Sequence, residues 1–346
     1  MKKLCSLITV CMAASLAASL CACGATTTPT TLSFAGDLQV LYGENGYPQA
    51  VLVAKKSVIE SDEAAVGTMI GYFEGSKAYL ETAQGAAVAS LLSEKYPSGM
   101  LPSFNAKNLT SEVISHCSVR FTKSADCKGA VNAFLEKLVA LDSTSTKTVG
   151  DSFYYTGTPT AGESSGSYKV YAPDGAPALS LANAIQQTTG SAFEYHVVAA
   201  TAINAQVTGE SPAADFCVLP VNVAAKLLGT GTTYQMLGTV TNGNMYFLGA
   251  GEQTELSAQN LASALKGKII GVVQLNNVPG LTLRCVLEEN NVPYEILGND
   301  TKVTDKNKVY LKAIQDAATG VTPAGGCDYY LCPEPAASAK VSAFKK

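Results

Sequence analysis

Several residue types are scarce in this sequence, and each shortage narrows the range of functions. The 346 residues include no Trp, so an aromatic ligand cage would have to use the sixteen Tyr instead of indole rings. Only two His are present, and no Cys or His group has zinc-site spacing. Charged residues make up 15% of the chain, the net charge is -4, and no Lys/Arg cluster suits a phosphate backbone. We therefore expect no metal site and no nucleic-acid partner.

Enzyme motifs are also missing. The sequence has no P-loop, no Rossmann fingerprint and no HExxH pair. The segment GESSG at 162–166 matches G-x-S-x-G around Ser164, but it lies in a Ser/Gly-rich stretch instead of between a strand and a helix, so we interpret the match as chance. His196 is expected in a strand, and His116 with Cys117 is left as a possible nucleophile pair. No catalytic residue and no cofactor are predicted.

The first thirty residues have the layout of a bacterial lipoprotein leader. Lys2 and Lys3 precede an apolar run, and the LCAC that ends at Cys23 resembles a lipobox, in which the final Cys is lipidated. We predict a signal peptide at 1–22, lipidation of Cys23 and a tether at 23–30. Cys21 is a weaker lipidation candidate, and an uncleaved membrane helix is the other interpretation. The body of the protein is then extracytoplasmic, anchored by lipid to the bacterial cell membrane.

Six further cysteines follow this leader, and two states are open to them. Outside the cytoplasm Cys117 could pair with Cys127, and Cys327 with Cys332, because each pair is close in sequence. The alternative is buried free thiols, since several of these residues lie in apolar, strand-like runs.

From residue 168 onward, strand-like and helix-like segments alternate, which predicts an α/β fold with open, mostly parallel sheets. Strands are expected at 168–173, 193–200, 214–220, 233–241, 245–251, 268–274, 294–298 and 327–333, and helices at 178–190, 201–210, 221–229, 256–267, 279–291 and 309–320. The earlier part is rich in helical patterns over 62–141 after a strand at 50–59. A linker rich in Ser, Thr and Gly follows at 143–167, in which the FYY at 153–155 is expected to pack.

Five turns carry the candidate binding residues, because each follows a predicted strand. In open α/β sheets, ligands bind beyond the carboxyl ends of the strands, where helix N-termini present free N–H groups. The same turns could also be ordinary βα connections, which favour Gly, Pro and Asn. The candidates in these turns are Gly175, Ala176, Pro177, Asn222, Asn244, Asn276, Asn277 and Glu334.

A family resemblance covers most of 167–346. The segments YKVYAPDGAPALSLANAI, ADFCVLPVNVAAKLLG, LKGKIIGVVQLNNVPGLTLRCVLEENN and DYYLCPEPAASA resemble substrate-binding proteins of ABC importers, in the sulfonate, nitrate, taurine and thiamine-precursor branch. In that family, text similar to DLQVLYGENGYPQAVLVAKKSVIES follows the PEPAA helix, whereas here it stands at 37–61. The chain therefore resembles a circular permutant, and a fusion of two half-proteins is the rival explanation.

The resemblance implies a type II periplasmic-binding fold with two lobes. Lobe A would span 52–249, as a helix-rich half (52–142), the linker (143–167) and a βα half (168–249). Lobe B would be discontinuous, built from 31–51 and 250–346. A small solute would bind between them by hinge closure, with Tyr47 and Gln49 near a crossing as further candidates.

The same resemblance implies an ABC permease and its ATPase as partners of a protein expected to be a monomer. The solute would be a sulfonate, a nitrate-like anion or, because the turns are poor in cations, a pyrimidine-type heterocycle. An enzyme of pyrimidine or thiamine-precursor metabolism on the same scaffold, and a ligand sensor without a transport role, are the alternatives.

Overall fold

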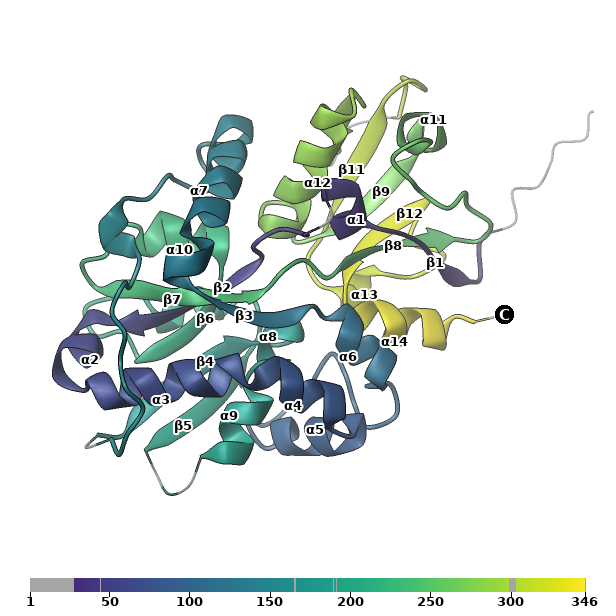
Figure 1. Cartoon of the computed structure of the whole chain (residues 1–346). Helices are drawn as coiled ribbons and strands as arrows, with labels where there is room; N and C mark the ends of the chain where they lie inside the picture. Colours follow the sequence, from purple (N-terminus) through teal and green to yellow (C-terminus); the bar gives the residue numbers. More distant parts are fainter. Residues whose placement is uncertain are drawn as a thin grey trace, which may run out of the picture.

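The computed structural model describes residues 28–43, 45–164, 166–188, 190, 192–298 and 303–345. The chain is an α/β protein with two mixed sheets, and each sheet forms the centre of one lobe (Figure 1). The predicted signal peptide and Cys23 lie outside the described residues, so the signal peptide and the lipid anchor stay predictions. Within the described ranges no helix combines the length and the apolar character that a bilayer crossing needs.

Lobe A is built on the strand order β3-β7-β2-β6-β4-β5. β4 pairs in parallel with β5 and β6, whereas β2 is antiparallel to both β6 and β7. The inner strands are nearly unbroken apolar runs because helices cover both of their faces. The strands are β2 (Ala50–Lys55), β3 (Val119–Lys123), β4 (Tyr168–Pro173), β5 (Phe193–Val198), β6 (Phe216–Pro220) and β7 (Tyr234–Thr241).

Lobe B is built on the strand order β1-β8-β12-β9-β11-β10. The four strands from β12 to β10 are parallel, and β8 is antiparallel to its neighbours β1 and β12. The strands are β1 (Leu32–Asp37), β8 (Met245–Ala250), β9 (Ile269–Val273), β10 (Tyr294–Ile296), β11 (Val309–Ile314) and β12 (Tyr329–Pro333). β1, the first strand of the described residues, therefore completes a sheet whose other strands come from residues 245–333.

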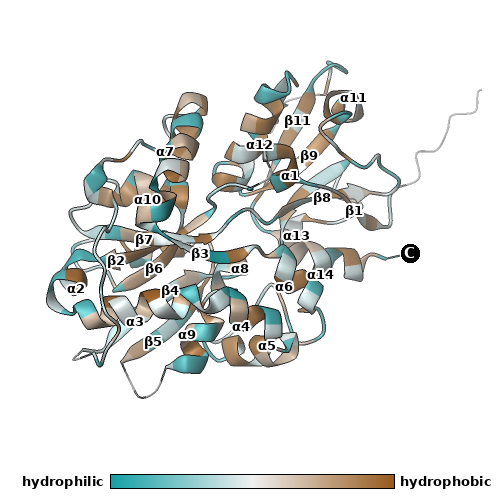
Figure 2. Cartoon of the chain, in the orientation of Figure 1, coloured by the Kyte–Doolittle hydropathy of each residue, from teal (hydrophilic) through white to brown (hydrophobic). Residues whose placement is uncertain are grey.

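Helices lie on both sides of each sheet, and the strands between them are the apolar centre (Figures 1 and 2). α7 (Ser124–Leu141) and α10 (Val221–Leu228) cover one face of lobe A, and α12 (Val278–Glu289) covers one face of lobe B. The other helices are α1 (Leu38–Tyr42), α2 (Lys56–Ser61), α3 (Glu63–Glu74), α4 (Ser76–Thr82), α5 (Gly85–Ser93), α6 (Ser111–His116), α8 (Ala176–Leu179), α9 (Ala182–Gln187), α11 (Leu261–Leu265), α13 (Ala317–Gly320) and α14 (Ala336–Ala343).

One apolar core joins the two lobes. α7 buries Val131, Phe134, Leu135 and Leu138, whose spacing of three, four and seven residues places them on one face of the helix. These side chains belong to the same buried cluster as Leu281 and other residues of α12, β9 and β12 in lobe B. The lobes therefore share part of their hydrophobic interior beside the segments that connect them.

The chain passes between the lobes twice, through residues 43–49 and 242–244, which we call the connecting segments. Both passages come earlier than the lobe boundaries expected after 51 and after 249. Lobe A already begins with β2 at Ala50, and β8, which the sequence analysis assigned to lobe A, belongs to the sheet of lobe B. Gly46 and Gly243 have positive φ angles of 65° and 88°. A Cβ on Gly46 would lie 2.2 Å from the Asn242 carbonyl oxygen, so the segments touch where only glycine fits.

Most expected elements are confirmed, but several differ. The strand expected at 50–59 ends at Lys55 and is followed by α2, and the helix expected at 256–267 is limited to α11. The helix expected at 309–320 is wrong: VYLKAI forms β11, and only the short α13 follows, because the buried apolar run Val309–Leu311 shows no polar alternation. The helix expected at 201–210 shrinks to a 3₁₀ turn at Ile203–Gln206, and β3 was not anticipated.

The linker and the cysteines also have clear outcomes. Phe153 and Tyr154 are buried, and Tyr154 forms an isolated bridge with Met236 of β7, so this part of the linker packs as expected. The six described cysteines are free, buried thiols, and neither disulfide considered from the sequence is formed. All six lie in the apolar interior instead of at facing surface loops.

Candidate ligand-binding cleft

The turns singled out from the sequence meet in a cleft between the two lobes. A cavity of about 100 Å³ is lined from lobe A by the β4 turn and Pro220, from lobe B by Gln274 and Pro279, and by residues beside the connecting segments. Two further cavities, of about 180 and 420 Å³, continue from it, since each shares lining residues with the one before. Together they form one interlobe cleft along the carboxyl ends of β4, β6, β9 and β12.

The turn after β4 forms the wall of the cleft in lobe A. Gly175 has a φ angle of 100°, a conformation that side-chain-bearing residues rarely adopt, and the start of α8 follows at Ala176 and Pro177. The Asp174 carboxylate fixes the turn by accepting hydrogen bonds from the Tyr96 hydroxyl at 2.6 Å and from the Ser103 backbone N–H at 3.1 Å. Burial, together with this carboxylate, raises the pKa of Tyr96, so its hydroxyl stays a donor.

The turn after β9 forms the facing wall in lobe B. Gln274, its first residue, has a φ angle of 57°, in the left-handed region that is unfavourable for a residue with a long side chain. The Asn277 amide lies 3.4 Å from the Gln274 side-chain oxygen. Asn222 of lobe A places its amide nitrogen 3.4 Å from the Asn277 side-chain oxygen, so amides from both lobes meet across the cleft.

Asn244 links both lobes at the base of the cleft. Its side-chain oxygen accepts from the Gln49 amide at 2.6 Å, and the Gln49 side-chain oxygen accepts from the Asn244 backbone N–H at 3.0 Å. Its own amide donates to the Glu334 carbonyl at 2.8 Å, while the Glu334 N–H donates to the Asn244 carbonyl at 2.8 Å. Asn244 is 1% exposed, so these four bonds replace water almost completely.

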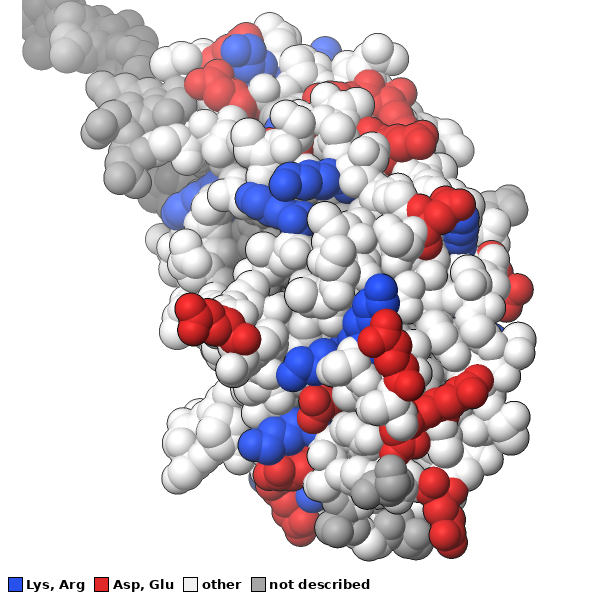
Figure 3. Space-filling view, turned by 90° about the vertical axis from the view of Figure 1, so that its left-hand side faces the viewer, with Lys and Arg blue, Asp and Glu red and all other residues white. Residues whose placement is uncertain are grey.

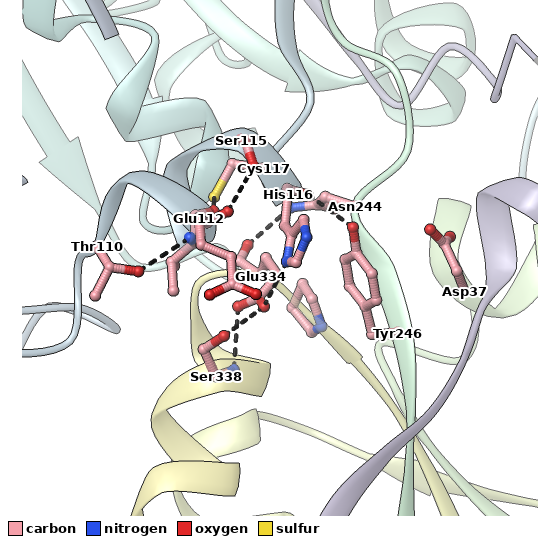
Figure 4. Close-up of polar contacts among 12 residues, drawn as sticks. Asp37, Thr110, Glu112, Ser115, His116, Cys117, Asn244, Tyr246, Glu334 and Ser338 are labelled. Atoms are coloured by element: carbon pink, nitrogen blue, oxygen red, sulfur yellow. Dashed lines mark hydrogen bonds and ion pairs between the residues drawn. The ribbon is translucent and has the colours of Figure 1, made fainter. Parts of the chain in front are cut away.

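The Glu334 carboxylate is fully buried behind this junction, between α14 and α6 (Figure 4). It accepts hydrogen bonds from the Ser338 hydroxyl at 2.6 Å and from the Ser338 N–H at 3.1 Å. His116 places Nδ1 3.9 Å from the same carboxylate and lies beside the Tyr246 ring. Burial raises the pKa of Glu334, while the Ser338 hydrogen bonds and His116 oppose this shift. The carboxylate is thus engaged within the protein and does not extend into the cleft as a free acceptor.

Tyr47 does not line the cleft. Its ring is 1% exposed and stacks on Phe134 of α7 at a centroid distance of 5.7 Å, with Tyr42 packed at its edge. Burial raises the pKa of its hydroxyl well above the usual range. The structure therefore corrects the expectation for Tyr47: this side chain belongs to the core that joins the lobes.

The structure brings the other nine predicted residues to the cleft, in two groups. Gly175, Ala176, Pro177, Asn244, Gln49 and Glu334 line the cavity nearest the connecting segments, and Asn222, Asn276 and Asn277 line its continuation. Sequence reasoning missed Asp174 and Gln274, although both lie in the turns that supplied other candidates. It also missed Ala200, which follows β5 and had no distinguishing residue type beside it.

The nucleophile pair considered from the sequence has unsuitable geometry. The Cys117 thiol is fully buried and lies 3.2 Å from the Val113 carbonyl, its hydrogen-bond acceptor. Burial, reinforced by the charge of Glu334, raises its pKa well above the usual range, so the thiolate is suppressed. Ser164 donates to the Asp62 carboxylate at 2.9 Å, and His196 instead lies 3.2 Å from Glu194.

Charge is sparse in the cleft and interspersed on the surface. None of the residues that line the two cavities nearest the connecting segments is Lys or Arg, and the third adds Lys226 beside Asp142. Asp142 also lies 3.5 Å from Arg284 of lobe B, and hydrogen bonds from Thr144 are the main cause of its pKa being lowered to about 2. On the face drawn in Figure 3, Lys and Arg alternate with Asp and Glu.

Comparison with known proteins returned no match. No family model matches the chain, and no curated protein or solved structure matches it. The family resemblance drawn from the sequence therefore stays a prediction.

Proposed function

We propose that the chain is the lipid-anchored, extracytoplasmic solute-binding component of an ABC import system. The observation that carries this proposal is the interlobe cleft, where polar turn residues of two separate sheets face one another. A solute held there contacts both lobes, so it binds the closed state more tightly than the open state and shifts the population toward closure. The closed form then delivers the solute to a permease driven by a cytoplasmic ATPase.

The lining favours a neutral, planar heterocycle such as a pyrimidine over a sulfonate or nitrate. Asn and Gln amides supply donors and acceptors without net charge, and Pro and Ala side chains supply flat apolar walls. A bound anion would need cations or converging N–H groups, and the two inner cavities have no Lys or Arg in their walls.

We also propose that the chain is circularly permuted relative to the family it resembles. The Leu32 N–H donates to the Phe344 carbonyl at 3.1 Å, so the end of α14 directly meets β1. In a rearranged chain, residues 1–27 would be followed by 167–345 and then by 31–166. This is the order expected of the family, and every helix and strand keeps its place in the fold. We expect such a rearranged chain to melt within a few degrees of the original and to bind the same solute. Failure to fold would count against permutation and favour the fusion of two half-proteins.

The binding proposal is tested first on the purified full chain. Mass spectrometry of retained ligand, followed by thermal shifts with pyrimidines, taurine and nitrate, identifies the solute class. A stabilisation of about 2.7 kcal/mol is expected at a hundredfold excess over Kd. No shift with any of these compounds, together with product formed from one of them, would favour the enzyme instead.

A paired substitution then locates the site. Gln274→Gly relieves the left-handed backbone and removes a side chain from the cleft, whereas Asn291→Gly relieves a φ of 54° at the end of α12, away from the lining residues. We expect both variants to be as stable as the original chain. Solute affinity should fall about tenfold only in Gln274→Gly, the effect of losing one or two hydrogen bonds. Equal affinities in the two variants would place the solute elsewhere.

A further inference from the structure

A second cavity lies on the other side of the connecting segments. It has a volume of about 780 Å³, larger than any of the three cleft cavities. Its walls are α1 with Gly43, Asn45 and Gly46 on one side, α4, α6 and the start of β3 on the other, with Asn242 at the base. We call it the rear groove. In lobe A, β7 and β2 separate β3, beside the groove, from β6 and β4, beside the cleft. In lobe B, β8 separates β1 from the cleft strands β12 and β9. Since β7, β2 and β8 adjoin the connecting segments, the groove and the cleft lie on opposite sides of these segments.

The rear groove combines an apolar floor with one uncompensated positive charge. Leu80, Ile114 and Val119 form the floor and are each less than 8% exposed. Lys77 lies 3.6 Å from Glu81, so these two charges offset each other. Arg120 is exposed at the edge, and no described residue forms an ion pair or hydrogen bond with its guanidinium. Asn45, Asn242 and Ser115 add neutral hydrogen-bonding groups.

This combination selects a ligand class. An apolar body covers the floor and releases water from it, and a single carboxylate meets Arg120 through charge-assisted hydrogen bonds. A ligand with several charges would leave all but one of them without a partner. The volume suits a molecule of one or two rings.

We propose that the rear groove binds a small amphipathic carboxylate and that its occupant restrains the angle between the lobes. The ligand site goes beyond the solute-binding role, while the restraint rests on the hinge motion proposed above.

The restraint follows from the position of the groove. Its two walls belong to different lobes and approach each other at one point, where the Ser118 hydroxyl donates to the Gln39 side-chain oxygen at 3.1 Å. Rotation about the connecting segments that opens the cleft brings the walls of the groove together. An occupied groove therefore favours the closed cleft, and by linkage a closed cleft favours the occupied groove.

The ligand site is tested with benzoate as the probe and benzamide as its neutral counterpart. Because the chain has no Trp, Val40→Trp places a single indole reporter on the exposed face of α1 that lines the groove. We expect benzoate to bind about tenfold more tightly than benzamide, the factor that one charge-assisted hydrogen bond supplies. Calorimetry on the chain without the reporter should give the same ratio.

Two variants decide the outcome. Arg120→Gln should abolish the preference for benzoate, whereas Lys306→Gln, which removes an exposed charge on the loop before β11, should leave it unchanged. Equal binding of the two probes by the original chain, or an unchanged preference in Arg120→Gln, overturns the site. This arm uses no transported solute, so its failure leaves the solute-binding proposal standing.

The restraint has its own test. Lys226→Cys and Asn276→Cys place exposed thiols on opposite lobes in the same cleft cavity, and a short bis-maleimide joins them in the closed state. The same variant capped with N-ethylmaleimide is the control. Benzoate should bind about threefold more tightly to the cross-linked form, a coupling of roughly 0.6 kcal/mol. Equal or weaker binding overturns the restraint, even if the Arg120 result supports the site.

Discussion

The junction at Asn244 gives the sharpest test of how the two lobes are held together. Asn244→Ala removes both side-chain hydrogen bonds of this buried residue while leaving its backbone bonds in place. The Glu334 carbonyl then loses its donor in a region without water, which costs about 1–3 kcal/mol. The half-buried Gln49 amide loses its acceptor, at a cost of about 1 kcal/mol, since water can partly replace it.

Together these losses predict that Asn244→Ala lowers the free energy of unfolding by roughly 2–4 kcal/mol. Urea unfolding followed by far-UV circular dichroism measures this change. Asn307→Ala removes an exposed Asn and should alter the stability by less than about 0.5 kcal/mol. A double-mutant cycle with Gln49→Ala should give a coupling energy of about 1 kcal/mol. A loss below about 1 kcal/mol for Asn244→Ala would show that the junction does not depend on this amide, and the reasoning would be wrong.

Two further predictions concern the buried acid and the connecting segments. The folded-state pKa of Glu334 is raised above its unfolded value of about 4.3. Its contribution to the free energy of unfolding is therefore full below about pH 4.3 and is lost as the pH rises through the folded pKa. The other titratable groups that interact with this carboxyl are His116, Glu112, Cys117 and Cys332. In urea unfolding, Glu334→Gln should flatten the decline of stability above about pH 4 to 5, whereas Glu255→Gln, at an exposed position, should not. Parallel stability curves for the original chain and both variants would contradict this. Gly46→Ala introduces backbone strain at a positive φ and also a clash with the Asn242 carbonyl. Gly99→Ala is the control, since its surroundings are open and it meets only the strain, about 1–2 kcal/mol. Gly46→Ala should therefore lower the melting temperature further, and equal melting temperatures would contradict the close packing of the connecting segments.

The sequence was sufficient for the features that depend on local patterns. Alternating apolar segments predicted the α/β class, the turns at their ends predicted eight residues that line one cleft, and the family resemblance added Gln49. Local patterns were insufficient where the period is hidden by burial. VYLKAI at 309–314 opens with three consecutive buried apolar residues, so a strand and a buried helix read alike, and the helix was chosen wrongly.

Other features depend on contacts between residues distant in the sequence. Tyr47 stands in a polar segment, yet Phe134 covers its ring. The Glu334 carboxylate is engaged by Ser338, four residues away, and by His116, which lies over two hundred residues earlier. The rear groove likewise combines α1, the helix-rich half of lobe A and Asn242, so no single stretch of sequence contains its pattern.

The hydrophobic core shared by α7 and α12 has a consequence for how the protein unfolds. Neither lobe can lose its structure without stripping apolar cover from the other, so heat should melt the molecule in a single calorimetric peak instead of two. The same shared hydrophobic core limits the angle through which the two lobes can rotate, because rotation requires packed side chains to slide past one another.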